Sequence, residues 1–187
     1  MSSADFDIQI MRLAHSLRGL SPEPLIDRLL PLIEVAADFA EKTDLCSTLV
    51  TGLSVAGFPK VGHRYALVFA QEFDSVAAWR DLSLACDRIG DLDGAVPPVQ
   101  TAFGKAVQRK ELVNDTFGFL MRALLKAGRP PAELDAALSS RLAAPAGRPD
   151  CEPETDWVNE ADRAGADRDL LVRYLGLAGF EVDEDDP

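Results

Sequence analysis

A glycine followed closely by a proline recurs four times along the first 130 residues of the chain. The four pairs are Gly19 and Pro22, Gly57 and Pro59, Gly90 and Pro97, and Gly128 and Pro130. Glycine tolerates the left-handed backbone that ends many helices, and proline is favoured in the first turn of the next helix. The glycines are spaced by 38, 33 and 38 residues. A stop and a restart at this period predict a helix-turn-helix unit that is used several times.

Apolar residues between these boundaries recur at helical spacing. The segments with this pattern are 7–18, 24–41, 60–73, 76–89 and 113–127. Ala and Leu are abundant while Ile, Thr and Tyr are scarce, which favours helices over strands, and no convincing alternating pattern is present. We therefore expect an all-α fold, a stack of antiparallel helical hairpins that forms an α-solenoid body over residues 1–142.

The third unit carries a family resemblance. The stretch 78–102 resembles the tetratricopeptide repeat, a helical hairpin. The consensus offsets of that family are occupied by Trp79, Leu82, Gly90, Asp91, Ala95 and Ala102. The resemblance covers about 25 residues, and the other units share only the turn signals and a few apolar positions. It implies a tetratricopeptide-like stack whose first helices line a concave groove.

Pro97 and Pro98 depart from that pattern, because they fall where the second helix of the repeat would already have begun. A proline deep in a helix costs about 3 kcal/mol. We therefore expect this helix to begin near Pro97.

Charge is distributed unevenly along the sequence. The net charge is −12, yet residues 150–187 hold 13 acidic and 3 basic residues, so residues 1–149 carry only −2. Such asymmetry is typical of an interaction tail or of a solubilising one. The sequence pI near 4.5 disfavours direct binding to nucleic acid.

The C-terminal part differs from the body. Residues 143–153 (AAPAGRPDCEP) have the composition of a linker, and residues 154–180 predict an acidic helix pair that caps the stack. Asp156 and Asp167 are the expected N-caps of these two helices. The acidic tail 181–187 is expected to be disordered.

Catalytic and metal-binding motifs are missing from the sequence, so we expect no enzyme, no cofactor and no metal site. No apolar run approaches the roughly 20 residues that span a bilayer. The three cysteines are far apart, which favours free thiols in the cytoplasm. Cys46 and Cys86 lie on apolar stripes and are expected in the core, whereas Cys151 lies in the predicted linker.

The tetratricopeptide resemblance implies a set of groove-lining positions. Those we take as partner-binding are Arg80, Leu84, Asp87, Arg88, Arg122 and Lys126, and the same mapping includes Ala77, Asp115, Gly118 and Leu125. Segment 105–129 has a net charge of +4, which would suit an acidic peptide or the carboxyl terminus of another protein. Ordinary solvated helix faces remain an alternative interpretation of the same residues.

The function that these observations favour is a protein-interaction module or adaptor. One alternative is a small acidic protein, like an immunity protein or an antitoxin, that inhibits a basic partner such as a nuclease. A second is a helical enzyme or small-molecule binder. A further hypothesis is that the acidic segment 150–187 folds back on the basic groove, so that deleting the residues after Arg148 would strengthen partner binding.

Overall fold

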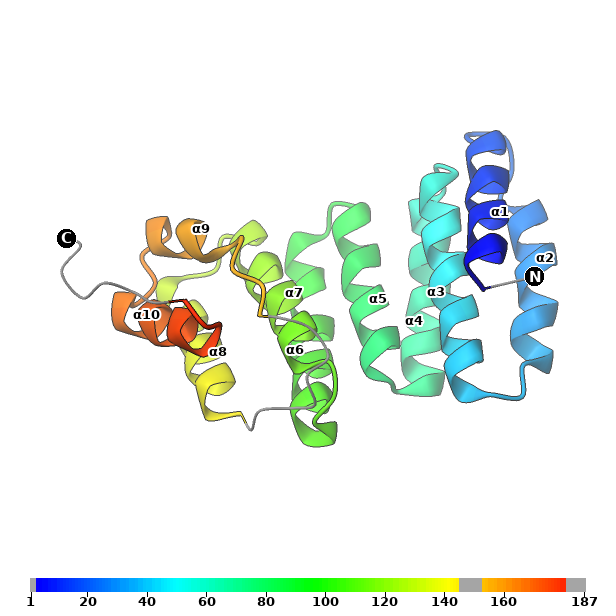
Figure 1. Ribbon diagram of the computed structural model, residues 1–187. Coiled ribbons are helices and arrows are strands. Elements are labelled where there is room, and N and C mark those ends of the chain that lie inside the picture. Colours follow the sequence, from blue (N-terminus) through cyan, green and yellow to red (C-terminus); the bar gives the residue numbers. More distant parts are fainter. Residues whose placement is uncertain (1–2, 145–152, 181–187) are drawn as a thin grey trace. The chain divides into compact units, whose positions relative to one another are not determined.

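The computed structural model describes residues 3–144 and 153–180, and these residues form helices and connections without a strand (Figure 1). The helices are α1 (Ser3–Ser16), α2 (Glu23–Val35), α3 (Phe39–Val55), α4 (Pro59–Phe73), α5 (Val76–Arg88), α6 (Leu92–Arg109), α7 (Val113–Lys126), α8 (Pro131–Ala143), α9 (Val158–Arg163) and α10 (Arg168–Leu177). The all-α prediction is confirmed for this part of the chain. Most of the predicted linker and the whole of the predicted tail 181–187 lie outside the described residues.

The protein divides into two compact units, Met1–Pro98 and Val99–Pro187, so that the boundary falls inside α6. The sequence-based division into a repeat body, a linker and a C-terminal pair stays a prediction.

The predicted glycine stops coincide with turns between helices. Gly19, Gly57, Gly90 and Gly128 have φ angles of 72°, 89°, 81° and 60°. They follow α1, α3, α5 and α7, and another helix begins shortly after each of them. A left-handed backbone of this kind strains any residue with a Cβ atom, which is why glycine occupies these turns. The local signal is therefore confirmed, whereas a tetratricopeptide-like stacking of the hairpins stays a prediction.

The first unit packs around α3, which contacts α1, α2, α4 and α5. Its core is apolar and almost fully buried, and its largest members are Ile10, Leu25, Leu29, Leu49, Leu53 and Phe69. The start of α5 shows the local logic, because the Ser75 hydroxyl accepts a hydrogen bond of 3.1 Å from the backbone N–H of Ala78. Cys46 and Cys86 are 3% and 4% exposed, so the expectation that both lie in the core is confirmed.

The prediction of one continuous helix over 24–41 is wrong. Helix α2 ends at Val35 and α3 begins at Phe39. Ala36 leaves the helical conformation with ψ of 121°, and Asp38 caps α3 through a 3.0 Å hydrogen bond from the N–H of Ala40. The helical spacing of apolar residues continues across positions 36–38, so it gave no sign of the break, which the capping side chain of Asp38 marks.

The start that we expected for α6 is also wrong, because the helix begins at Leu92 and includes Pro97 and Pro98. The carboxylate of Asp91 accepts a hydrogen bond of 2.9 Å from the N–H of Gly94, which caps the first turn. The prolines cost α6 hydrogen bonds in its early turns. Burial of Ala95 and Val96 ahead of them offsets that cost.

The second unit contains α7 and α8, with α9 and α10 packed on them. The predicted helix pair at the C-terminal end is present, and Asp167 caps α10 by accepting hydrogen bonds from the N–H groups of Asp169 and Leu170. The expected cap of α9 is wrong. Trp157 occupies that position, and Asp156 instead pairs with Arg122.

Candidate functional site

The positions that the resemblance assigned to a groove lie in different units. Arg80, Leu84, Asp87 and Arg88 belong to α5 in the first unit, whereas Arg122 and Lys126 belong to α7 in the second. Arg80, Asp87 and Lys126 are each already engaged in an interaction within the protein.

On α5 the charges of two arginines act on the partly buried carboxylate of Asp81. Burial raises the pKa of Asp81, and the charges of Arg80 and Arg88 oppose that shift. Asp81 also accepts a hydrogen bond from the Ser47 hydroxyl, which joins α5 to α3. Arg80 and Arg88 therefore act as partial counter-charges for Asp81.

On α7 the side chain of Arg122 binds two carboxylates from the C-terminal part of the protein. Its Nη2 lies 2.5 Å from Oε2 of Glu154, and its Nη1 lies 3.0 Å from Oδ1 of Asp156. The guanidinium also lies over the ring of Phe119, 5.2 Å from the ring centroid. Arginine with two carboxylates is the acidic-ligand chemistry that the sequence predicted, but the described partners belong to the same polypeptide.

Gly118 shows how closely this acidic segment covers α7. A Cβ atom built on Gly118 would lie 2.1 Å from Oε2 of Glu154. Gly118 and Arg122 were both groove positions of the family mapping, and the segment 153–157 lies against them. Glu154 and Asp156 thus meet Arg122 on α7, whereas the fold-back of the whole segment 150–187 on a groove stays a prediction.

An aromatic cluster anchors the same segment. Trp157 is 2% exposed, and its ring centroid lies 5.6 Å from that of Phe117 and 5.0 Å from that of Tyr174. The Tyr174 hydroxyl donates a 3.0 Å hydrogen bond to the backbone carbonyl of Glu154. These buried rings make the α9–α10 pair part of the core of the second unit. The pair is not a loosely held tail.

A hollow in the first unit was not predicted. It is formed by α1, α2 and α3, has a volume of about 760 Å³, and is lined by Phe6, Asp7, Leu32, Val35, Ala36, Ala37, Asp38, Ala40, Glu41, Asp44, Leu45 and Thr48. We call it the α1–α3 groove. It lies where the helical backbone breaks between α2 and α3, so a signal for the break at Asp38 would have been needed to find it.

Four carboxylates and seven apolar residues line the α1–α3 groove. Leu32 is 38% exposed and Val35 is 76% exposed, so folding leaves much of their apolar surface in water. Asp7 accepts a 3.2 Å hydrogen bond from the Thr48 hydroxyl. The lining contains no Lys, Arg or His side chain. None of the six residues that the sequence predicted as partner-binding belongs to it.

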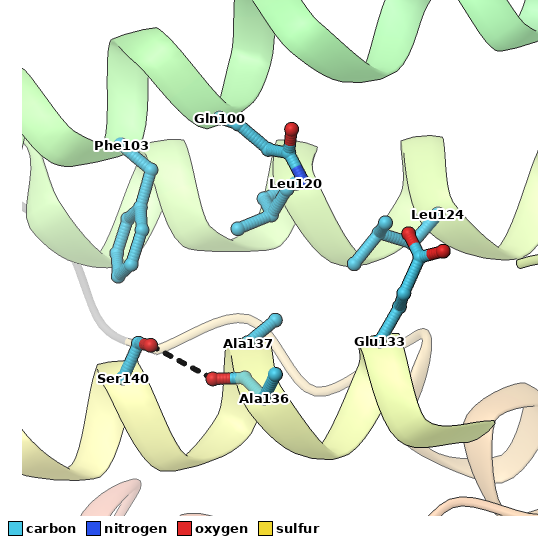
Figure 2. A pocket seen from close by; sticks show the side chains of 8 residues that line it. All are labelled: Gln100, Phe103, Leu120, Leu124, Glu133, Ala136, Ala137 and Ser140. Carbon is cyan, nitrogen blue, oxygen red and sulfur yellow. Dashed lines mark hydrogen bonds between the residues drawn. The ribbon is translucent and has the colours of Figure 1, made fainter. Parts of the chain in front are cut away.

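A smaller hollow of about 300 Å³ lies in the second unit and is shown in Figure 2. Apolar side chains form most of it: Phe103, Leu120, Leu124, Ala136 and Ala137. Its polar lining residues are Gln100, Glu133 and Ser140; Ser140 donates a 2.8 Å hydrogen bond to the Ala136 carbonyl, and Glu133 lies 3.9 Å from Nε of Arg129. The Ser140 hydroxyl therefore donates to the backbone of its own helix and not to a general base that could activate it.

Groups suited to catalysis or to metal binding are sparse over residues 3–144 and 153–180. No cluster of three or more metal-ligating side chains occurs in that part of the protein. Burial, together with the charges of Glu72 and Asp81, raises the pKa of the Cys46 thiol to about 12. A thiol that stays protonated at neutral pH is a poor nucleophile. None of the described helices is both long enough and apolar enough to cross a membrane.

Comparison of the sequence and fold with protein-family models, with characterised proteins and with solved structures finds no match. The tetratricopeptide resemblance of 78–102 therefore stays a prediction.

Proposed function

We propose that this protein is an interaction module that holds a segment of a partner protein in the α1–α3 groove. The observation that carries the proposal is the exposure of Leu32 and Val35 inside a hollow of about 760 Å³. Removing apolar surface from water stabilises a complex by about 25 cal/mol per Å². Pockets that hold ligands have volumes of about 300–1,000 Å³.

The chemistry of the groove supports binding rather than catalysis. Its polar side chains are four carboxylates and the hydroxyl of Thr48, which donates to Asp7. A hydroxyl that donates to a carboxylate lacks the oriented imidazole or amine that usually activates such a nucleophile. An interaction role needs only shape, apolar surface and charge, and the groove supplies all three.

The α7 face is a weaker choice for the partner site, although the sequence favoured it. Glu154 and Asp156 already bind Arg122, and the neighbouring Trp157 is buried. A partner there would have to displace a segment that the core of the second unit holds in place. The α1–α3 groove needs no such displacement.

A second candidate function is inhibition of a basic protein, and the negative charge of the α1–α3 groove favours it. All four charged groove residues are acidic: Asp7, Asp38, Glu41 and Asp44. An acidic surface that steers and covers a basic active site would suit a nuclease inhibitor. One-to-one co-purification with a nuclease, and loss of nuclease activity in the complex, would support this function.

A photo-crosslinking residue placed at Val35 tests the main proposal. A crosslinker at Val68, which is 53% exposed on α4 and lies outside the groove, controls for general surface contact. We expect cells of the native host to give one protein that crosslinks at position 35 and not at position 68.

The captured protein must then be purified and its affinity measured by calorimetry. We expect the double variant Leu32→Asp/Val35→Asp to bind it at least about 10-fold more weakly, because charges would enter an apolar contact. The matched control is Leu67→Asp/Val68→Asp, since Leu67 is 40% exposed, close to the 38% of Leu32. Equal affinities of all three proteins would contradict the proposal.

A further inference from the structure

We propose that the occupant of the α1–α3 groove is a basic amphipathic helix of a partner protein. This inference rests on the proposed function and adds the chemistry and the secondary structure of the bound segment. It follows from the charge of the groove, its apolar residues and its helical walls.

The charge of the groove has one sign. Asp7, Glu41 and Asp44 are exposed carboxylates, and Asp38 stands at the break between α2 and α3. The nearby Lys42 does not line the groove, and its ammonium lies 5.5 Å from the ring centroid of Phe73. Several like charges around an apolar surface raise its affinity for the opposite charge and repel other anions.

The apolar residues between these carboxylates come from three helices. Phe6 lies on α1, Leu32 and Val35 on α2, and Leu45 on α3. Lysine and arginine have long aliphatic stems that lie along such a surface while their charged ends reach outward. A segment with apolar residues on one face and basic residues beside them would contact both parts of the groove.

The walls of the groove favour a helical occupant. One common mode, in which an extended peptide adds a strand to an open sheet edge, does not apply because residues 3–144 and 153–180 contain no strand. A groove between helices receives the apolar face of another helix through residues at i, i+3, i+4 and i+7. The partner segment should therefore carry this spacing.

Other occupants from the protein itself are disfavoured by charge. A second copy would bring a net charge of −12 to an acidic surface. The C-terminal residues 181–187 (EVDEDDP) are acidic and would be repelled in the same way.

Selection from a phage-displayed library of random 18-residue peptides on the full-length protein tests the inference. Phage that also bind a Leu32→Asn/Val35→Asn variant, which loses the apolar contact without gaining negative charge, are removed before sequencing. We expect the remaining peptides to contain more Lys and Arg than Asp and Glu, with apolar residues at helical spacing. One such peptide is then synthesised for affinity measurements and circular dichroism.

The triple variant Asp7→Asn/Glu41→Gln/Asp44→Asn should bind this peptide at least about 10-fold more weakly. The matched control is Glu160→Gln/Asp162→Asn/Asp169→Asn, which changes the net charge equally at exposed sites on α9 and α10. It should bind the peptide within about twofold of the parent protein. Binding to the parent should also weaken as salt is raised.

Several results would overturn the inference. Peptides that are neutral or acidic, that bind without forming a helix, or that bind the triple variant and the parent equally would do so while leaving the proposed function intact. A homodimer that Val35→Asp dissociates would assign the groove to a second copy. A selection that yields no peptide dependent on Leu32 and Val35 would remove both the inference and the proposed function.

Discussion

The guanidinium of Arg122 on α7 contacts the carboxylate of Glu154, 32 residues further along the sequence, at 2.5 Å. This pair joins the acidic C-terminal part of the protein to the basic part of the second unit. Both side chains keep about a third of their surface exposed, at 31% and 37%. The pair therefore fixes where the segment lies more than it stabilises the fold.

A double-mutant cycle measures that contribution. We expect Arg122→Gln and Glu154→Gln each to lower the free energy of unfolding by about 0.5–1 kcal/mol, because exposed ion pairs are worth little in water. The double variant should lose less than the sum of the two single changes, by a coupling of a few tenths of a kcal/mol or more. Urea unfolding followed by circular dichroism gives all four values. Strict additivity would mean that the two side chains do not interact in solution.

Gly118 gives a prediction whose sign depends on Glu154. Alanine in a helix interior is favoured over glycine by about 1 kcal/mol. In the parent protein, however, the new methyl group would push Glu154 out of its contact with Arg122. Gly118→Ala should therefore change stability little in the parent and raise it by about 1 kcal/mol when Glu154 is already Ala.

Gly104 on α6 is the matched control for this effect, because a Cβ atom built there meets nothing within 4 Å. Gly104→Ala should stabilise the parent and the Glu154→Ala variant equally. A dependence of the Gly104 effect on Glu154 would show that the background changes the whole unit and not the local contact.

The burial of Trp157 indicates how strongly the C-terminal segment stabilises the second unit. Trp157 is 2% exposed and packs on Phe117 and Tyr174. Trp157→Ala should lower the free energy of unfolding by about 3–5 kcal/mol, as for other buried aromatic residues. Leu177→Ala, at a site 45% exposed on α10, should cost much less.

The same contacts change the expectation for a truncated protein that ends at Arg148. The sequence suggested that such a variant would bind a partner more strongly through an uncovered groove. The structure adds that this deletion removes Trp157 and Tyr174 from the core around Phe117. We expect faster amide hydrogen exchange in α7, so the variant Glu154→Gln/Asp156→Asn, which keeps Arg122, is a better way to free this face.

The sequence predictions were accurate where a feature depends on a single residue and failed where it depends on several residues together. The turn at Gly57 was predictable because a left-handed φ of 89° is a property of one residue. The break before α3 was missed because alanines at 36 and 37 favour helix, and only the cap at Asp38 opposes them.

For contacts between distant segments, the sequence predicted only that segments of opposite charge would attract each other. The charge counts suggested that the acidic segment meets the basic face, but they did not identify Arg122 and Glu154 as the pair. The burial of Trp157 was also missed, because the residues before it, PETD, are polar and give no helical apolar period. The α1–α3 groove depends on three helices at once, so no local pattern indicates it.

Asp81 makes the stability of the first unit depend on pH. Burial raises its pKa above the ordinary 3.8, so the protonated form is favoured in the folded state. The stability that this provides is fully present below the ordinary pKa and is lost as pH rises through the higher folded pKa. Asp81→Asn has no charge to bury, so its stability relative to the parent should rise from about pH 4 upward.

The size of this rise is about 1.4 kcal/mol for each unit by which the folded pKa exceeds the unfolded one. The control is Ser47→Ala, which removes a hydrogen bond that lowers the pKa of Asp81. This variant should lose more stability at pH 7 than at pH 3, because only the charged carboxylate depends strongly on that donor. Urea unfolding at several pH values gives both comparisons. Parallel stability curves for the parent and Asp81→Asn would show that Asp81 is well solvated in the folded protein.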